Sequence, residues 1–174
     1  MKSCSFFGHR NLILSEEEIE KLKKILIDLI ENKNVRNFLF GSRSLFNGLC
    51  FSLLYKLKKK YPFLCLIAYD CAHEDSIAID DKVKYDRMQV FQNIEYFDKK
   101  IKLNRVFSAG RLAYVVRNQE MIDNSDYCCF YFKEDYRPPK MKQSKRSILE
   151  VQPKSGTKLA LDYARRKEKE IILI

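Results

Sequence analysis

The stretch CSFFGHRNLILSEEE, residues 4–18, decides the fold, because it joins a strand to a helix through a short polar turn. Cys4–Phe7 is an apolar run of the kind that forms a buried strand, and it stops at the turn Gly8–Arg10. A helix is expected from Ser15, because Ser15 and Glu18 have the spacing of a capping box. A glycine, a histidine and an arginine therefore meet at the end of the first strand.

Apolar strands and amphipathic helices alternate along the whole chain. Strands are predicted at residues 3–7, 35–40, 63–69, 127–132 and 171–174. Helices are predicted from about residue 15, at 45–60, at 111–122 and at 157–166, with a short one within 85–97. Strands that are apolar throughout and separated by such helices are typical of a parallel sheet covered on both faces. The prediction is an α/β, Rossmann-like, doubly wound domain, with a mainly parallel five-stranded sheet and helices on both faces.

Length and composition indicate one folded domain that spans residues 1–174. A chain of 174 residues with 46% hydrophobic residues is ordinary for a single domain built around a core. No apolar stretch approaches the roughly 18 residues of a membrane-spanning helix. The residues before Gly8 are too few for a signal peptide. We therefore expect a cytoplasmic protein with no membrane contact.

The six cysteines are scattered, contain no C-x-x-C pair and lie mostly in apolar runs, which is typical of buried, reduced thiols. With two histidines in the chain, a zinc site is not expected. The cluster Cys71–Asp75 has metal-ligand chemistry, but we interpret it as a polar loop after a strand. Neither a metal nor a cofactor is predicted.

The net charge of +10 suggests an anionic partner, and half of that charge lies in one segment. Residues 133–154 are predicted to be a basic loop inserted before the last helix. Its acid-free part carries Arg137, Lys140, Lys142, Lys145 and Arg146. Two interpretations stay open: a solvated insertion, or a cover over a phosphate-bearing ligand or nucleic acid.

Three polar turns are expected to meet at one edge of the sheet. Gly8–Arg10 follows the first strand, Gly41–Arg43 follows the second, and Ser155–Thr157 opens the last helix. In a doubly wound sheet, ligands bind beyond the carboxyl ends of the strands, where the strand order reverses. Glycine lets a ligand approach the backbone, helix N-termini attract phosphate, and arginine adds bidentate contacts. The sequence therefore predicts an anion site at this edge.

Five segments in this order carry a family resemblance: FFGHR, FLFGSRSLFN, KKKYPFLCLIAY, RNQEMIDNSDYCCFYF and SGTKLALDYARRKEKEIILI. They resemble the YpsA-like branch of the SLOG superfamily, which groups Rossmann-like proteins with the DNA-processing protein DprA and the "lonely guy" phosphoribohydrolases. The resemblance covers residues 4–132 and 155–174 and does not extend across 133–154. It implies a nucleotide or a nucleotide-derived phosphorylated ligand.

The resemblance places ligand contacts in the loops after the first two strands, in a helix that faces the cleft and in the turn before the last helix. To these we add Arg43 for phosphate, Asn47 for a ribose, and Tyr69 or Phe46 for stacking on a base. The predicted ligand-binding residues are Gly8, His9, Arg10, Gly41, Ser42, Arg43, Asn47, Tyr69, Arg117, Asn118, Ser155, Gly156 and Thr157.

Two carboxylates of the related proteins are missing from this chain. Asn47 stands where the YpsA-like pattern often has an aspartate, and an amide cannot act as a base. The phosphoribohydrolases carry Pro-Gly-Gly-x-Gly-Thr-x-x-Glu, whereas this chain has Gln152–Lys154 for Pro-Gly-Gly and Ala160 for the glutamate. These departures argue against hydrolysis by the known scheme and leave open whether the protein is an enzyme.

Three functions follow from these observations. The first is binding or sensing of a nucleotide or nucleotide-derived phosphorylated ligand at the carboxyl edge of the sheet. The alternative is hydrolysis of a nucleotide N-glycosidic bond by a carboxylate after the third strand: Asp70, Glu74, Asp75 or Asp86. The second alternative is DNA binding through the cations of residues 137–146. Self-association also stays open, because superfamily members often pair.

Overall fold

The computed structural model describes residues 1–9, 14–41, 44–70, 96–103, 110–138, 140–142 and 150–174. The strands of the main sheet are β1 (Lys2–Gly8), β2 (Val35–Phe40), β3 (Cys65–Asp70), β4 (Lys99–Lys102), β5 (Tyr127–Tyr131) and β8 (Glu170–Leu173). The helices around it are α1 (Glu16–Glu31), α2 (Leu45–Leu57), α4 (Gly110–Asp123) and α5 (Gly156–Arg166). A separate pair of short strands is β6 (Met141–Lys142) and β7 (Glu150–Val151).

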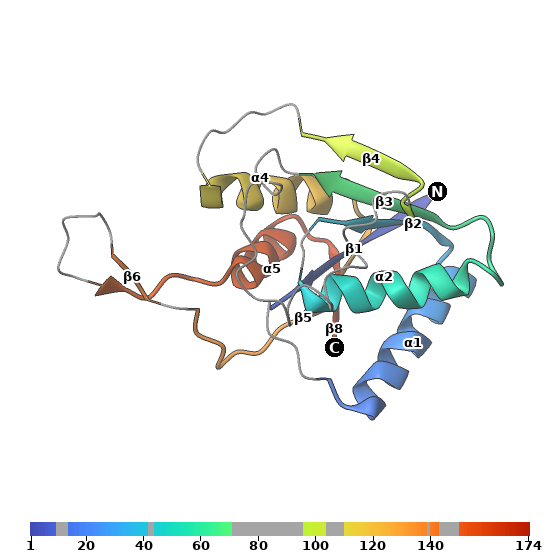
Figure 1. The fold of residues 1–174 in the computed structure, drawn as a ribbon, viewed down its shortest axis with the longest axis horizontal. Coiled ribbons are helices and arrows are strands. Elements are labelled where there is room, and N and C mark those ends of the chain that lie inside the picture. The colour runs from blue at the N-terminus through green and yellow to red at the C-terminus, as the bar shows by residue number, and fades with distance from the viewer. Residues whose placement is uncertain (10–13, 42–43, 71–95, 104–109, 139, 143–149) are drawn as a thin grey trace.

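The strand β1 lies inside a six-stranded parallel sheet with the order β4-β3-β2-β1-β5-β8. From β1 the chain first adds strands on one side, up to β4, and then crosses over to add β5 and β8 on the other side. The strand order therefore reverses between β1 and β5 (Figure 1). This arrangement confirms the prediction of a Rossmann-like, mainly parallel α/β sheet.

The prediction of five strands missed β4, and the reason is physical. This strand reads Lys-Lys-Ile-Lys, with exposed lysines and a half-buried Ile101. It is an edge strand that pairs with β3 alone, so it has no need of the apolar run that marks a central strand. Lysines on an edge also discourage pairing with another chain. The short helix expected within residues 85–97 lies almost wholly outside the described residues.

The helices cover both faces of the sheet, as predicted (Figure 1). On one face, the core includes Leu26 of α1 and Phe46 of α2. On the other face, Leu161 of α5 packs with residues of α4 and the strands. Phe6 and Phe7 are neighbours in β1, yet each belongs to a different core, because successive side chains of a strand point to opposite faces. Cover on both faces explains why β1 is buried along most of its length.

Serine residues cap the N-termini of α1, α2 and α5. Each of Ser15, Ser44 and Ser155 accepts a hydrogen bond from a backbone N–H three residues further on. The predicted capping box is present, since the Ser15 N–H also donates to the Glu18 carboxylate at 2.8 Å. In contrast to α1, helices α2 and α5 have no acidic residue in the first turn. Their positive N-terminal ends therefore have no carboxylate of their own first turn to neutralise them.

The basic segment, residues 133–154, contains more structure than the predicted loop. Strands β6 and β7 pair antiparallel within it, with Met141 opposite Val151. The Gln152 side-chain amide donates to the Pro138 carbonyl at 2.5 Å and so joins the two limbs of the segment. In Figure 1 this ribbon projects away from the body of the domain. The two limbs therefore support one another rather than packing on the sheet.

Two glycines at the carboxyl edge are required by close packing of helices. A Cβ built on Gly8, the last residue of β1, would lie 2.5 Å from the Cβ of Phe46 in α2. A Cβ on Gly41, directly after β2, would lie 2.8 Å from Nε of Arg117 in α4. These glycines let α2 and α4 approach the ends of the strands, whereas the sequence suggested that they make room for a ligand.

The substitution Gly8→Ala should lower the free energy of unfolding by about 1–3 kcal/mol, because the added methyl group overpacks the contact with Phe46. Gly156→Ala is the matched control, since no atom lies within 4 Å of its Cβ position at the start of α5. That variant should change stability by no more than about 1 kcal/mol, in the stabilising direction. Urea unfolding followed by circular dichroism measures both. Equal midpoints for the two variants would contradict the packing argument.

Candidate ligand site at the carboxyl edge of the sheet

The switch point of the sheet places the ends of β1 and β5 side by side. Gly8 of β1 lies opposite Tyr131 of β5, and the chain continues into His9 on one side and Phe132 on the other. In doubly wound sheets, the crevice beyond this point is where ligands bind. The structure therefore places His9 where such folds hold their ligands.

His9 is buried between aromatic rings at this point, and only 3% of its surface is exposed. The backbone N–H of Lys133 donates to Nε2 of His9 at 3.1 Å. The imidazole stacks on the ring of Tyr136, with 4.0 Å between centroids and 26° between the planes. The ring of Phe132 lies 5.5 Å away. The residues after β5 thus fold over His9 and enclose it.

The hydrogen bond from Lys133 determines where the imidazole carries its proton. Nε2 accepts, so in the neutral ring the proton is on Nδ1. Nδ1 is buried and has no hydrogen-bond partner among the described residues. Burial lowers the pKa of His9, so the neutral form is favoured. The site therefore holds a buried N–H donor for which the described residues provide no acceptor.

The first turn of α2 lies over the same edge. Phe46 packs on Gly8 and stacks with Tyr131, with 5.9 Å between the ring centroids. Behind it, the Asn47 amide donates to the Ser44 hydroxyl at 3.0 Å, and both residues are buried. Asn47 therefore stabilises the start of α2. The ribose contact inferred for it stays a prediction.

The first turn of α5 lies beside the end of β5. The Lys158 ammonium is 5.6 Å from the centroid of the Phe132 ring. It also pairs with Asp162 at 2.9 Å, and hydrogen bonding to this ammonium lowers the pKa of Asp162. Ser155 is buried as the helix cap, whereas Gly156 is exposed. In the predicted phosphate turn, Ser155–Thr157, the part that faces solvent is therefore the backbone of Gly156.

Arg117 of α4 brings a positive charge to the end of β2. It is 2% exposed and is among the largest fully buried side chains. Its Nε lies against Gly41, and its guanidinium lies over the ring of Tyr114 at 5.2 Å. This arrangement places a guanidinium at the carboxyl end of β2, the strand that pairs with β1.

The structure gathers several predicted residues at one edge, from separate elements: Gly8, His9, Gly41, Asn47, Arg117, Ser155, Gly156 and Thr157. Asn118 is half-buried beside Arg117 in α4. Tyr69 is 5% exposed and packs in the core on the α4 side, which leaves no open ring face for a base. Asp70 is half-buried at the end of β3.

Other predicted residues lie outside the described part of the chain. These are Arg10, Ser42 and Arg43 of the ligand loops, Glu74, Asp75 and Asp86 of the hydrolytic alternative, the cluster Cys71–Asp75, and Lys145 and Arg146 of the basic segment.

The sequence did not single out the residues that enclose His9, namely Phe132, Lys133 and Tyr136. A signal was available, because the run YFKEDY follows directly on the apolar strand before the switch point. Two aromatic residues, Phe132 and Tyr136, stand close together in this run. A turn formed by the residues between them can bring both rings onto one neighbouring side chain. The basic side chains of residues 133–154 determined how that segment was interpreted, and these two aromatic rings were given no role.

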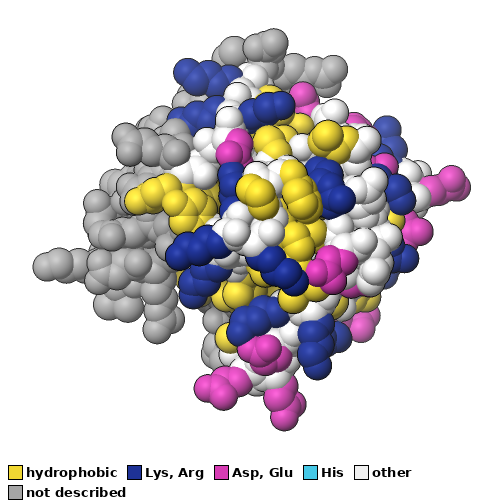
Figure 2. All heavy atoms as spheres, turned by 90° about the vertical axis from the view of Figure 1, so that its right-hand side faces the viewer, with side chains coloured by type: hydrophobic (Ala, Val, Ile, Leu, Met, Phe, Trp, Pro, Cys, Tyr) yellow, Lys and Arg dark blue, Asp and Glu magenta, His cyan; other side chains and the backbone are white. Residues whose placement is uncertain are grey.

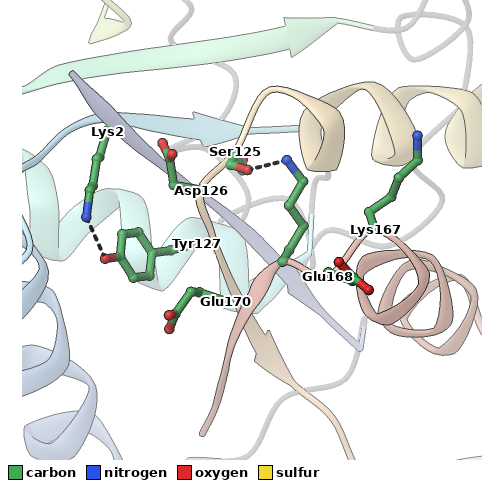
Figure 3. A pocket seen from close by; sticks show the side chains of 8 residues that line it. Lys2, Ser125, Asp126, Tyr127, Lys167, Glu168 and Glu170 are labelled. Carbon is green, nitrogen blue, oxygen red and sulfur yellow. Dashed lines mark hydrogen bonds between the residues drawn. The ribbon is translucent and has the colours of Figure 1, made fainter.

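The opposite edge of the sheet offers no comparable donor among the described residues. An open hollow of about 350 Å³ lies there (Figure 3) and is lined by Lys2, Ser125, Asp126, Tyr127, Lys167, Glu168, Lys169 and Glu170. Two of its cations are engaged, since the Lys2 ammonium donates to the Tyr127 hydroxyl at 3.2 Å and that of Lys169 to the Ser125 carbonyl at 2.7 Å. Figure 2 shows the side that carries the amino ends of β1 to β3, where apolar side chains lie among Lys and Arg.

Within the described residues, no group of three or more His, Cys, Asp or Glu side chains could hold a metal ion. In the same part of the chain, every helix is too short or too polar to cross a membrane. Cys4, Cys50, Cys128 and Cys129 are buried free thiols, and burial raises the pKa of each. These thiols therefore stay protonated and pack as small apolar groups.

Comparison with known proteins adds a structural relative. No family model and no curated protein matches the chain. Among solved structures, it is similar to DNA processing protein A from Helicobacter pylori, a protein with a single-stranded DNA binding mode. The TM-score is 0.55 at 15% sequence identity, over 99% of this chain and 64% of that protein. The chain thus spans less than two thirds of its relative, and the likeness shows a shared Rossmann-like fold; nothing in it singles out the YpsA-like branch.

The pKa of His9 in the folded protein should lie below about 6.5, the usual value of a histidine. Because the unfolded chain then binds the proton more readily, the stability contributed by neutral His9 is complete above about pH 6.5 and falls at lower pH. Lys133 and Asp135 are the charged groups that act on it, in opposite directions.

Imidazole NMR tests this directly, because the chain has only His9 and His73, and His73→Gln assigns the signals. At pH 7 we expect a neutral His9 ring with its proton on Nδ1. A pKa at or above 6.5, or a proton on Nε2, would show that the enclosure described above is wrong.

Proposed function

We propose that this chain binds single-stranded DNA, with one nucleotide held at the carboxyl edge of the sheet between β1 and β5. The observation that carries the proposal is the buried His9 N–H, which lacks an acceptor among the described residues at the switch point of the sheet. Phosphate oxygens and base carbonyls are acceptors that would satisfy it. Leaving such a donor unsatisfied costs about 1–3 kcal/mol, so a ligand that bonds it recovers that free energy.

The basic segment supports a polyanionic ligand, because both its ends are attached at this edge. It begins at Lys133, which bonds His9, and ends before Ser155, which caps α5. Residues 133–154 contain seven basic and three acidic residues. Among those described, Lys133, Arg137, Lys140 and Lys154 are exposed. Phosphates that cross the carboxyl edge would therefore meet cations on its border.

Aromatic rings at the same edge favour a single strand over a duplex. Phe132 lies beside His9, and Lys158 lies over the Phe132 ring. Proteins that bind single strands without sequence preference combine a positive groove with rings on which bases stack. The solved structure of DNA processing protein A adds support from a protein of the same fold with such a ligand.

A free phosphorylated nucleotide is the second candidate, and the deep burial of the polar groups favours it. His9 and Arg117 are almost completely buried, as expected for residues that enclose a small ligand rather than line an open track. Under this alternative the protein captures or senses a nucleotide, and the basic segment covers the bound phosphate.

Fluorescence anisotropy with a labelled oligothymidylate tests the main proposal. We expect affinity to fall steeply with salt, and the triple variant Arg137→Gln, Lys140→Gln, Lys154→Gln to bind more weakly. Losing three phosphate contacts should reduce the slope of log affinity against log salt by about 2, since each contact contributes roughly 0.7 for a single strand.

The matched control replaces three cations on and just after α1: Lys21→Gln, Lys24→Gln and Lys33→Gln, all exposed. It removes the same charge but should retain the slope. Equal losses in both triple variants would show that only net charge matters, and absence of binding by the native chain would reject the proposal. Calorimetry with mononucleotides tests the second candidate, which gains if a mononucleotide binds and the oligonucleotide does not.

A further inference from the structure

The ring of Tyr136 lies on His9 with the geometry of a stacked base. The ring centroids are 4.0 Å apart and the planes are inclined by 26°, on a residue that is almost fully buried. Aromatic side chains and nucleobases stack in this same offset, near-parallel way. Tyr136 thus occupies a ring-sized position on the face of His9.

We propose that Tyr136 holds, in the free protein, the position of one base of the ligand, and that an unstacked base replaces it on His9 when the ligand binds. This inference rests on the proposed function, because it names the part of the ligand that enters the crevice. The site therefore takes a nucleobase rather than phosphate alone.

Tyr136 leaves unsatisfied what a nucleotide would satisfy. Nδ1 of His9 lacks an acceptor among the described residues with the tyrosine ring in place. A base stacked on the face of His9 takes the place of the tyrosine ring. The Nδ1–H bond lies in the plane of the imidazole, so its acceptor is an oxygen of the sugar–phosphate that the base brings with it. The replacement thus keeps the stacking on His9 and adds a hydrogen bond that tyrosine does not make.

The turn that carries Tyr136 is held mainly by hydrogen bonds within the basic segment. The Tyr136 N–H donates to the Lys133 carbonyl at 3.2 Å, and the Arg137 guanidinium donates to the Glu134 carbonyl at 2.8 Å. Pro138 accepts from Gln152 within the same segment. Among the described residues, the Lys133 N–H bond to Nε2 of His9 and the ring stack of Tyr136 join this turn to the sheet. Tyr136 can therefore swing off His9 about Lys133 while the hydrogen bonds within the segment stay intact.

Tyr136→Ala tests the inference, with Tyr136→Phe as the control that keeps the ring. If Tyr136 competes with a base, its removal should tighten binding of oligothymidylate by about threefold or more, because a larger fraction of the protein is then open. Tyr136→Phe should bind like the native chain. A base-free deoxyribose-phosphate strand of equal length should bind both variants and the native chain alike, which separates a base from a phosphate in the crevice.

Imidazole NMR of the native chain gives a second measurement that needs no variant. Oligothymidylate should shift the His9 signal, and the base-free strand should leave it in place. Weaker or unchanged binding by Tyr136→Ala, or an unmoved His9 signal when the native chain is saturated with oligothymidylate, would overturn the inference while leaving DNA binding intact. If the native chain and both variants bind neither strand, the proposed function itself fails.

Discussion

The parallel pairing of β1 with β2 on one side and with β5 on the other is the constraint on which the rest of this structure depends. It puts β1 inside the sheet, buried on both faces, and forces the chain to cross over before β5. Helices must then start close to the strand ends, and α2 does so directly over Gly8. The same crossover creates the switch point at which ligands bind in doubly wound sheets. The packing and the candidate ligand site therefore have one common origin.

His9 shows how this constraint becomes chemistry. The residue after a central strand is carried into the crevice and buried there, at a cost to its protonated form. The bond from Lys133 holds the neutral ring, and among the described residues Nδ1 has no acceptor. A buried donor without an acceptor lowers local stability, and such exceptions are concentrated at functional sites. The local cost and the proposed ligand contact therefore have the same source.

Much of the fold could be predicted because buried strands and helices require apolar residues at a characteristic spacing. The run before Gly8 and the helix capped by Ser15 were recognisable from spacing alone, and the structure has both. The strand β4 has no such apolar run, because an exposed edge strand accepts lysine, here at three of its four positions. The roles of Gly8 and Gly41 were also out of reach, because a glycine that admits a helix looks the same in sequence as one that admits a ligand.

By itself, the sequence determined the alternation of strands and helices, the helix caps and the arrival of polar turns at strand ends, because these depend on local spacing and on burial. Only the tertiary structure decided that Tyr136 stacks on His9 and that Arg117 lies against Gly41. Those contacts join residues far apart in the chain, and their existence depends on strand order and on the depth at which α4 packs. Neither the strand order nor the packing depth of α4 produces a repeating pattern in a single sequence. The contacts around His9 and Arg117 therefore follow from packing in three dimensions.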